Sequence, residues 1–152
     1  MRAALWTTLL FASLFAYEKG DRIDQKTIDR LRLQKEKVYI IDFFASWCHS
    51  CEKEMPHLVK LDATLDRSKF ELIGVDVDKD LANATAFQSR MKERFGADFR
   101  IVNDPEGVII KTFKPLGMPS LYIVKENKVA FILTGATDDI DRVVTERLKA
   151  LP

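Results

Sequence analysis

Two cysteines, Cys48 and Cys51, stand three positions apart, and they are the only cysteines in the 152-residue chain. They follow the apolar run VYIIDFF at residues 38–44, which Asp42 alone interrupts. Such a run is typical of a buried central strand. After the cysteines, leucines recur at helical spacing as far as Leu65, which predicts a helix that begins at the pair. The sequence therefore places two thiols between the end of a core strand and the start of a helix.

Strand and helix patterns alternate through the rest of the chain. They predict helices over residues 27–34, 81–95 and 137–151, strands over 70–78 and 99–102, a short helix or extended piece over 108–113, and a β-hairpin over 120–135. Thr137 or Asp138 is expected to cap the last helix. This order predicts an α/β fold with helices on both faces of one sheet. Open sheets of this class place their functional sites at strand ends.

Composition is that of an ordinary globular domain, with 47% hydrophobic and 31% charged residues. The length most simply gives one domain, which is large enough to bury a core without crosslinks. The net charge of +1 indicates neither a nucleic-acid partner nor a strongly acidic substrate.

The N-terminus has a different composition from the rest. Arg2 is followed by fourteen uncharged residues, 3–16, and then by charged residues. This pattern predicts a secretory signal peptide over 1–16 with cleavage after Ala16, and a domain over 17–152. An uncleaved membrane anchor over 3–16 is the alternative, although a span usually needs about twenty residues. An ordinary first strand or helix is a third reading.

A close cysteine pair has three candidate roles. A structural crosslink gains stability by closing a long loop, and this pair closes a very short one. A metal site could use both cysteines with His49 and His57, the only histidines. On a helix, however, Cys51 and His57 lie about 240° apart around the axis. A redox-active thiol pair is the reading that the sequence favours, particularly in an exported protein.

The position at a helix start gives the two thiols different chemistry. Unpaired amides at a helix N-terminus stabilise a thiolate and lower its pKa from about 8.5 to roughly 3.5–7.5. Cys48 is therefore the expected nucleophile. Cys51 lies one turn deeper and is expected to resolve the mixed disulfide that Cys48 forms.

The residues IDFFASWCHSC and GMPS at 117–120 resemble the thioredoxin fold. The spacing C-x-x-C-x-x-E-x-P, from Cys48 to Pro56, resembles its exported TlpA/ResA-like branch. The resemblance runs from about Val38 to the C-terminus. It implies a thioredoxin-like fold with a central mixed sheet, flanking helices and a central insertion at about 79–104.

The resemblance also implies an activity, that of an exported, periplasmic thiol:disulfide oxidoreductase acting on protein substrates. A reductant fed by a membrane electron donor of the DsbD/CcdA type is expected, with cytochrome c maturation as one process it could serve. An oxidase or isomerase is the alternative, and a metal-binding or non-catalytic module is a further one. No organic cofactor is expected, because the dithiol carries both electrons, and a monomer is expected.

Further site residues follow from the resemblance. Asp42 matches a buried acid that takes the proton of Cys51, and such an acid should have a raised pKa. The lysine that often pairs with this acid is replaced here by Gly74. Pro119 matches the cis-proline of the family, and the backbone of Met118 is expected to pair with a substrate strand.

Four residues around the cysteines complete the expected site. Glu54 lies three positions after Cys51, on the same helix face, where it could influence the protons of the pair. Trp47 matches a tryptophan that flanks family sites. His49 and Ser50 lie between the cysteines, where they are expected to tune the redox potential, and a protonated His49 would further stabilise a Cys48 thiolate.

Overall fold

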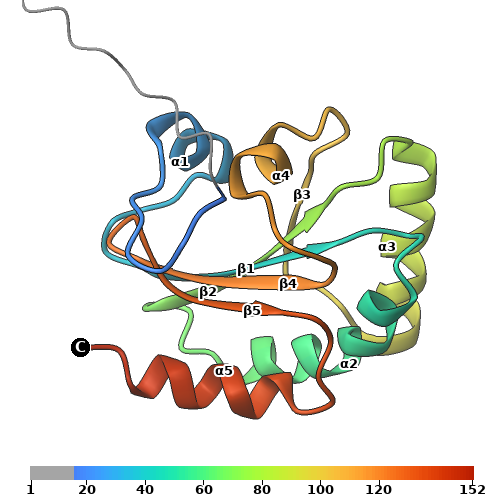
Figure 1. Cartoon of the computed structure of the whole chain (residues 1–152). Helices are drawn as coiled ribbons and strands as arrows, with labels where there is room; N and C mark the ends of the chain where they lie inside the picture. The colour runs from blue at the N-terminus through green and yellow to red at the C-terminus, as the bar shows by residue number, and fades with distance from the viewer. Residues whose placement is uncertain (1–15) are drawn as a thin grey trace, which may run out of the picture.

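The computed structural model of the chain describes residues 16–152, in which strands and helices alternate around one mixed sheet (Figure 1). The strands are β1 (Val38–Phe44), β2 (Phe70–Asp76), β3 (Arg100–Asn103), β4 (Ser120–Lys125) and β5 (Lys128–Thr134). Their order is β3-β2-β1-β4-β5. β1 pairs in parallel with β2 and antiparallel with β4. The apolar run is therefore the central strand, and the expected α/β class with a mixed sheet is confirmed.

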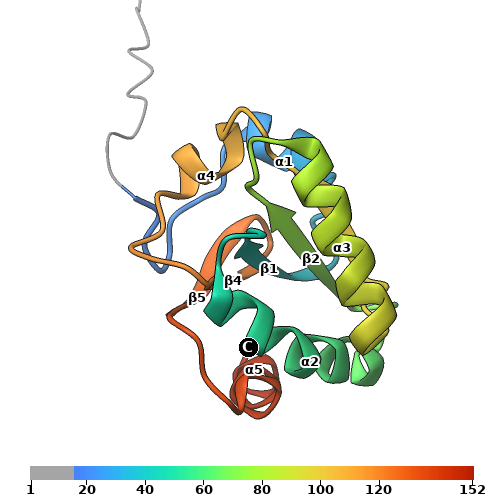
Figure 2. The same cartoon turned by 90° about the vertical axis from the view of Figure 1, so that its right-hand side faces the viewer.

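Helices cover both faces of the sheet (Figures 1 and 2). They are α1 (Gln25–Leu31), α2 (His49–Thr64), α3 (Leu81–Phe95), α4 (Val108–Phe113) and α5 (Ile140–Lys149). α2, α3 and α5 pack on one face, and α1 and α4 pack on the other. α3 and β3 form the expected insertion, with β3 extending the sheet beside β2.

Alternation along β1 divides its side chains between two cores. Ile40 and Phe44 belong to the core beneath α2, α3 and α5, whereas Phe43 belongs to the core beneath α1 and α4. Successive strand residues point to opposite faces. Asp42 therefore faces the same side as Ile40 and Phe44, toward the helix that carries the cysteines.

Residues 17–24, which we call the N-terminal strap, run along the hairpin end of the sheet. Gly20 N–H donates to the carbonyl of Val129 at 2.7 Å, and Val129 N–H donates to the carbonyl of Asp21 at 2.9 Å. Ile23 N–H donates to the carbonyl of Asn127 at 2.8 Å. The strap thus covers the outer side of β5 at this end.

Some expected boundaries differ from the structure. β2 ends at Asp76, two residues early, because Asp78 turns into the loop that precedes α3. The expected cap of the last helix by Thr137 or Asp138 is wrong, since Asp139 is the N-cap residue and makes no side-chain capping bond. The Thr137 hydroxyl instead donates to the Asp139 carboxylate at 2.8 Å.

The expected signal peptide or anchor lies outside the described residues, apart from Ala16. Within residues 16–152, every helix is too short or too polar to cross a membrane.

Candidate active site

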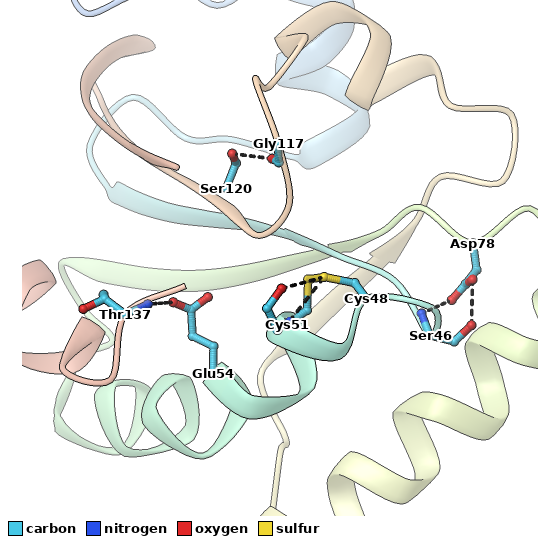
Figure 3. The surroundings of a disulfide bond; sticks show 9 residues. Ser46, Cys48, Cys51, Glu54, Asp78, Gly117, Ser120 and Thr137 are labelled. Atoms are coloured by element: carbon cyan, nitrogen blue, oxygen red, sulfur yellow. Dashed lines mark hydrogen bonds between the residues drawn. A yellow bond between two sulfur atoms is a disulfide. The ribbon is translucent and has the colours of Figure 1, made fainter. Parts of the chain in front are cut away.

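Cys48 and Cys51 form a disulfide with an S–S distance of 2.04 Å (Figure 3). Cys48 is the N-cap residue of α2, and its sulfur accepts a hydrogen bond from Cys51 N–H at 3.3 Å. Cys48 is 5% exposed and Cys51 is 1% exposed. The expected order of shielding therefore holds, since Cys51 is the more buried of the two.

A tight turn connects β1 to the cysteines. Cys48 N–H donates to the carbonyl of Ala45 at 3.1 Å, and Cys48 has extended backbone angles. The helix then begins at His49. The first amides of a helix have no partner within it, and the amide of Cys51 points toward the Cys48 sulfur, where it favours the charged form.

Glu54 is buried one turn after Cys51. Its carboxylate accepts a hydrogen bond from the backbone N–H of Thr137 at 3.3 Å, in the loop between β5 and α5. Burial raises the pKa of Glu54 from 4.5 to about 7, and the Thr137 hydrogen bond partly offsets this rise. Glu54 can therefore take or release a proton near neutral pH, as a general acid or base requires.

Asp42 is a second buried acid on the same side of the sheet, and only 1% of it is exposed. Among residues 16–152, its Oδ1 atom finds no hydrogen-bond partner. Burial raises the pKa of Asp42 well above 3.8, and repulsion from Glu54 raises it further. Asp42 lies opposite Gly74 of β2, the position that the sequence resemblance matches to a lysine. Glu54 therefore acts on the pKa of Asp42 within the core beneath α2.

The loop before β4 brings Pro119 to this end of the sheet. The Met118-Pro119 peptide bond is cis, as expected. Ser120 Oγ donates to the carbonyl of Gly117 at 2.7 Å, and Gly135 N–H donates to the carbonyl of Pro119 at 2.9 Å. These two bonds fix the loop around the proline, and Figure 3 shows the first of them.

The residues that flank the cysteines lie at the surface. Trp47 is 67% exposed, so it contributes little to the core and presents its ring to solvent. His49 is exposed, and Ser50 Oγ lies 3.7 Å from the Cys48 sulfur. Ser50 therefore contacts the Cys48 sulfur with its side chain.

The structure separates the side chains of the metal-site alternative. His57 Nδ1 lies 3.6 Å from the carboxylate of Asp141 in α5, away from the cysteines. Within residues 16–152, no group of three or more histidine, cysteine or acidic side chains is arranged to hold a metal ion. The described part of the chain thus offers no donor set for that alternative.

Two contacts at the site were not expected from the sequence. Both Asp78 carboxylate oxygens accept hydrogen bonds from Ser46, two residues before Cys48. Thr137 supplies the amide that contacts Glu54. In the view of Figure 3 the disulfide lies between these two contacts. The signal for the first is the D-V-D run that ends an apolar strand, but nothing in that run identifies its partner.

The comparisons with known proteins agree with this geometry. A sequence model described as the AhpC/TSA family matches residues 13–132. The chain belongs to the AhpC/TSA family. A relative of this AhpC/TSA chain is the thiol-disulfide oxidoreductase ResA of Geobacillus thermodenitrificans, 30% identical over 107 residues. The match covers 70% of this chain and 59% of that protein. Two further ResA proteins are covered over 64% and 59% of their length, so the chain spans less than two thirds of these relatives.

Solved structures show the same fold as this AhpC/TSA chain. A thioredoxin-family thiol:disulfide interchange protein from Chlorobium tepidum TLS matches with a TM-score of 0.60 and 27% identity, over 75% of this chain and 81% of that one. A secreted disulfide oxidoreductase of Mycobacterium tuberculosis, described as homologous to DsbE of Escherichia coli, matches with a TM-score of 0.61 and 21% identity, over 77% and 84%. The thioredoxin-like fold implied by the sequence resemblance is thereby confirmed.

Proposed function

We propose that the chain is a thiol:disulfide oxidoreductase that exchanges the Cys48–Cys51 disulfide with protein substrates. The observation that carries the proposal is the pair itself, a disulfide across the first turn of α2. Its Cys48 sulfur accepts a hydrogen bond from the backbone N–H of Cys51. The name of the ResA relative, a thiol-disulfide oxidoreductase, supports the same chemistry. Pro119, which follows a cis bond in the loop that enters β4 at the same end of the sheet, supports it further.

The exchange proceeds in two displacements. In the dithiol form, the Cys48 thiolate attacks a substrate disulfide, forms a mixed disulfide and releases one substrate thiolate. Cys51 then gives its proton to a buried carboxylate, Glu54 or Asp42, and its sulfur displaces the second substrate thiolate from Cys48. The substrate gains two electrons and finally two protons, and the protein is left as the disulfide seen here.

The direction we propose is reduction of the substrate. A more stable thiolate favours the dithiol form and makes a protein more oxidising. The helix amide that donates to the Cys48 sulfur stabilises its thiolate and therefore favours the dithiol form. Glu54 opposes this effect when it is ionised, above its pKa of about 7, since negative charge one turn from Cys51 disfavours a thiolate. An ionised Glu54 on the helix that carries the cysteines therefore supports a reductant, and an oxidase or isomerase is the alternative.

The cellular setting is part of the proposal. Residues 1–16 are proposed to be a signal peptide or membrane anchor, so that residues 17–152 act outside the cytoplasm, in the periplasm or its equivalent. One solved relative of the same fold is described as secreted, which agrees with this placement. A membrane donor of the DsbD/CcdA type would return electrons to Cys48–Cys51, and cytochrome c maturation is the process proposed to use them.

Insulin reduction in the presence of dithiothreitol tests the activity, and equilibration with glutathione tests the direction. We expect catalysis of insulin reduction and a reduction potential near the thioredoxin end of the range of about −270 to −120 mV. A potential near the upper end would instead support the oxidase. A pair that fails to open and close reversibly would contradict both.

A further inference from the structure

A carboxylate from another part of the chain holds the turn that carries Cys48. Asp78 lies in the loop after β2 and is 4% exposed. Its Oδ2 accepts a hydrogen bond from Ser46 N–H at 2.7 Å, and its Oδ1 accepts one from Ser46 Oγ at 2.8 Å. Because Ser46 stands two residues before Cys48, both bonds act on the turn between β1 and α2 (Figure 3).

Further hydrogen bonds fix the position of Asp78 itself. Its backbone N–H donates to Asp76 Oδ1 at 3.0 Å, and Asp76 Oδ2 accepts a hydrogen bond from Gln88 Nε2 of α3 at 2.8 Å. The neighbouring Val77 N–H donates to the carbonyl of Phe44, the last residue of β1, at 3.0 Å. The carboxylate is thus anchored to the sheet and to α3, so it can restrain the turn rather than follow it.

We propose that Asp78 is a positioning residue for Cys48, holding Ser46 so that the sulfur stays at the start of α2 when the disulfide is open. The inference rests on the proposed exchange function, because it concerns the dithiol form. In the disulfide form the covalent bond to Cys51 already fixes Cys48. In the dithiol form that bond is gone, and the contact between Asp78 and Ser46 restrains the turn.

This difference between the two forms predicts a redox effect. Removing the contact frees the turn more in the dithiol form than in the disulfide form, and the gain in conformational entropy favours the dithiol. The disulfide then becomes easier to reduce. Closure of the ring also slows, since the Cys48 and Cys51 sulfurs meet less often.

The test is the equilibrium of the full chain with reduced and oxidised glutathione. For Asp78→Ala we expect a shift of about tenfold toward the dithiol, equal to about 30 mV for a two-electron couple. Ser46→Ala loses only the hydroxyl bond, and a shift of about two- to threefold is expected. Asp78→Asn keeps an acceptor for Ser46 N–H and gains a donor for Ser46 Oγ, so it should restore most of the wild-type equilibrium.

Asp104 provides a matched control. It is equally buried, and its carboxylate accepts hydrogen bonds from the backbone of Val108, Ile109 and Ile110 at the start of α4, at 2.8, 3.1 and 2.9 Å. Asp104→Ala should lower the melting temperature and leave the glutathione equilibrium unchanged.

The outcomes separate this inference from the proposed function. If Asp78→Ala lowers the melting temperature but keeps the wild-type equilibrium, the role of Asp78 is structural and the inference is overturned. If Asp78→Ala does not fold, Ser46→Ala decides by the same criterion. If the wild-type disulfide does not open and close reversibly, the proposed function is overturned, and the inference with it.

Discussion

The sulfur of Cys48 caps the helix in which Cys51 lies, accepting the Cys51 backbone N–H at 3.3 Å. The two cysteines also form a disulfide, so the Cys48 sulfur, expected to attack, lies within bonding reach of the Cys51 sulfur, expected to resolve. The two thiols have different surroundings, since one faces helix amides and the other lies deeper in the core. Separate roles for the cysteines are therefore testable one residue at a time.

Replacing each cysteine should block a different step. Cys48→Ser removes the attacking sulfur, so we expect insulin reduction to fall to the uncatalysed rate. Cys51→Ser keeps the attack and removes the resolving sulfur, so a mixed disulfide with substrate should accumulate on Cys48. Non-reducing gel electrophoresis and mass spectrometry detect it. A Cys51→Ser protein that turns over at the wild-type rate without trapping substrate would reverse the assignment.

In the reduced protein, Cys48 should be the more reactive thiol at neutral pH. Helix amides favour its thiolate, whereas burial disfavours that of Cys51. Alkylation by iodoacetamide, followed against pH by mass spectrometry, should give an apparent pKa below about 8.5 for Cys48 and a higher one for Cys51. The Cys48→Ser protein isolates the second value. Equal reactivity of the two thiols would count against the helix-terminus argument.

Glu54 should make the stability of the disulfide form depend on pH. Its pKa is about 7 when folded and 4.5 when unfolded, so the folded state binds more protons between these values. The free energy of unfolding should therefore fall as pH rises from 4.5 to about 7, by at most roughly 3–4 kcal/mol at 1.36 kcal/mol per pKa unit. Above that range Glu54 should contribute no further change.

Substituting Glu54 and Asp42 tests which of them causes the change of the unfolding free energy with pH. Glu54→Gln should flatten the unfolding free energy over that range, as measured by urea denaturation of the oxidised protein, in which the thiols do not titrate. Asp42→Asn should remove a further decline that begins near pH 3.8, because burial raises the pKa of Asp42 well above that value. If Glu54→Gln keeps the full wild-type slope, Glu54 is not the titrating group.

Gly74 should tolerate no side chain. A Cβ atom there would lie 2.5 Å from Phe44 Cε1 and 3.0 Å from Phe99 Cε2, both in buried rings. Gly74→Ala should therefore destabilise the fold by about 1–3 kcal/mol, as overpacking in a core usually does. A double-mutant cycle with Phe44→Leu checks the cause, since a smaller side chain at 44 should recover part of the loss. Additive effects would argue against the clash.

The crowding at Gly74 also accounts for the replaced lysine. The sequence resemblance suggested that Gly74 stands where other members of the fold have a lysine beside the buried acid, and the strand register places it opposite Asp42. The large Phe44 ring occupies the space that a lysine stem would need. Asp42 therefore keeps a carboxylate oxygen without a hydrogen-bond partner, and Glu54 is a neighbour that acts on its pKa.

Local patterns in the sequence were enough for most of the fold. The apolar run of β1 and the leucine spacing of α2 depend on neighbours a few residues away. The hairpin was predictable because two apolar runs flank Glu126 and Asn127. In the structure both turn residues adopt positive φ angles, a conformation that asparagine accepts readily in tight turns. These features bring the cysteines and Pro119 to one end of the sheet.

Contacts between distant residues could not be predicted in the same way. Ser46 and Asp78 are 32 positions apart, and Glu54 and Thr137 are 83 apart. These contacts carry no periodic signal: the parallel pairing of β1 with β2 brings Ser46 to Asp78, and the packing of α2 against α5 brings Glu54 to Thr137. The predicted cap of α5 failed for a related reason, because the backbone of Thr137 bonds to Glu54 of another helix.

The N-terminal strap has a consequence for self-association. An open sheet edge offers unpaired N–H and carbonyl groups that can recruit a strand from another molecule. Through Gly20 and Asp21, the strap occupies both outward-facing backbone groups of Val129 in the edge strand β5. Neighbouring copies of the protein therefore find this stretch already paired, and a variant lacking the strap would present it as a place for edge-to-edge aggregation to begin.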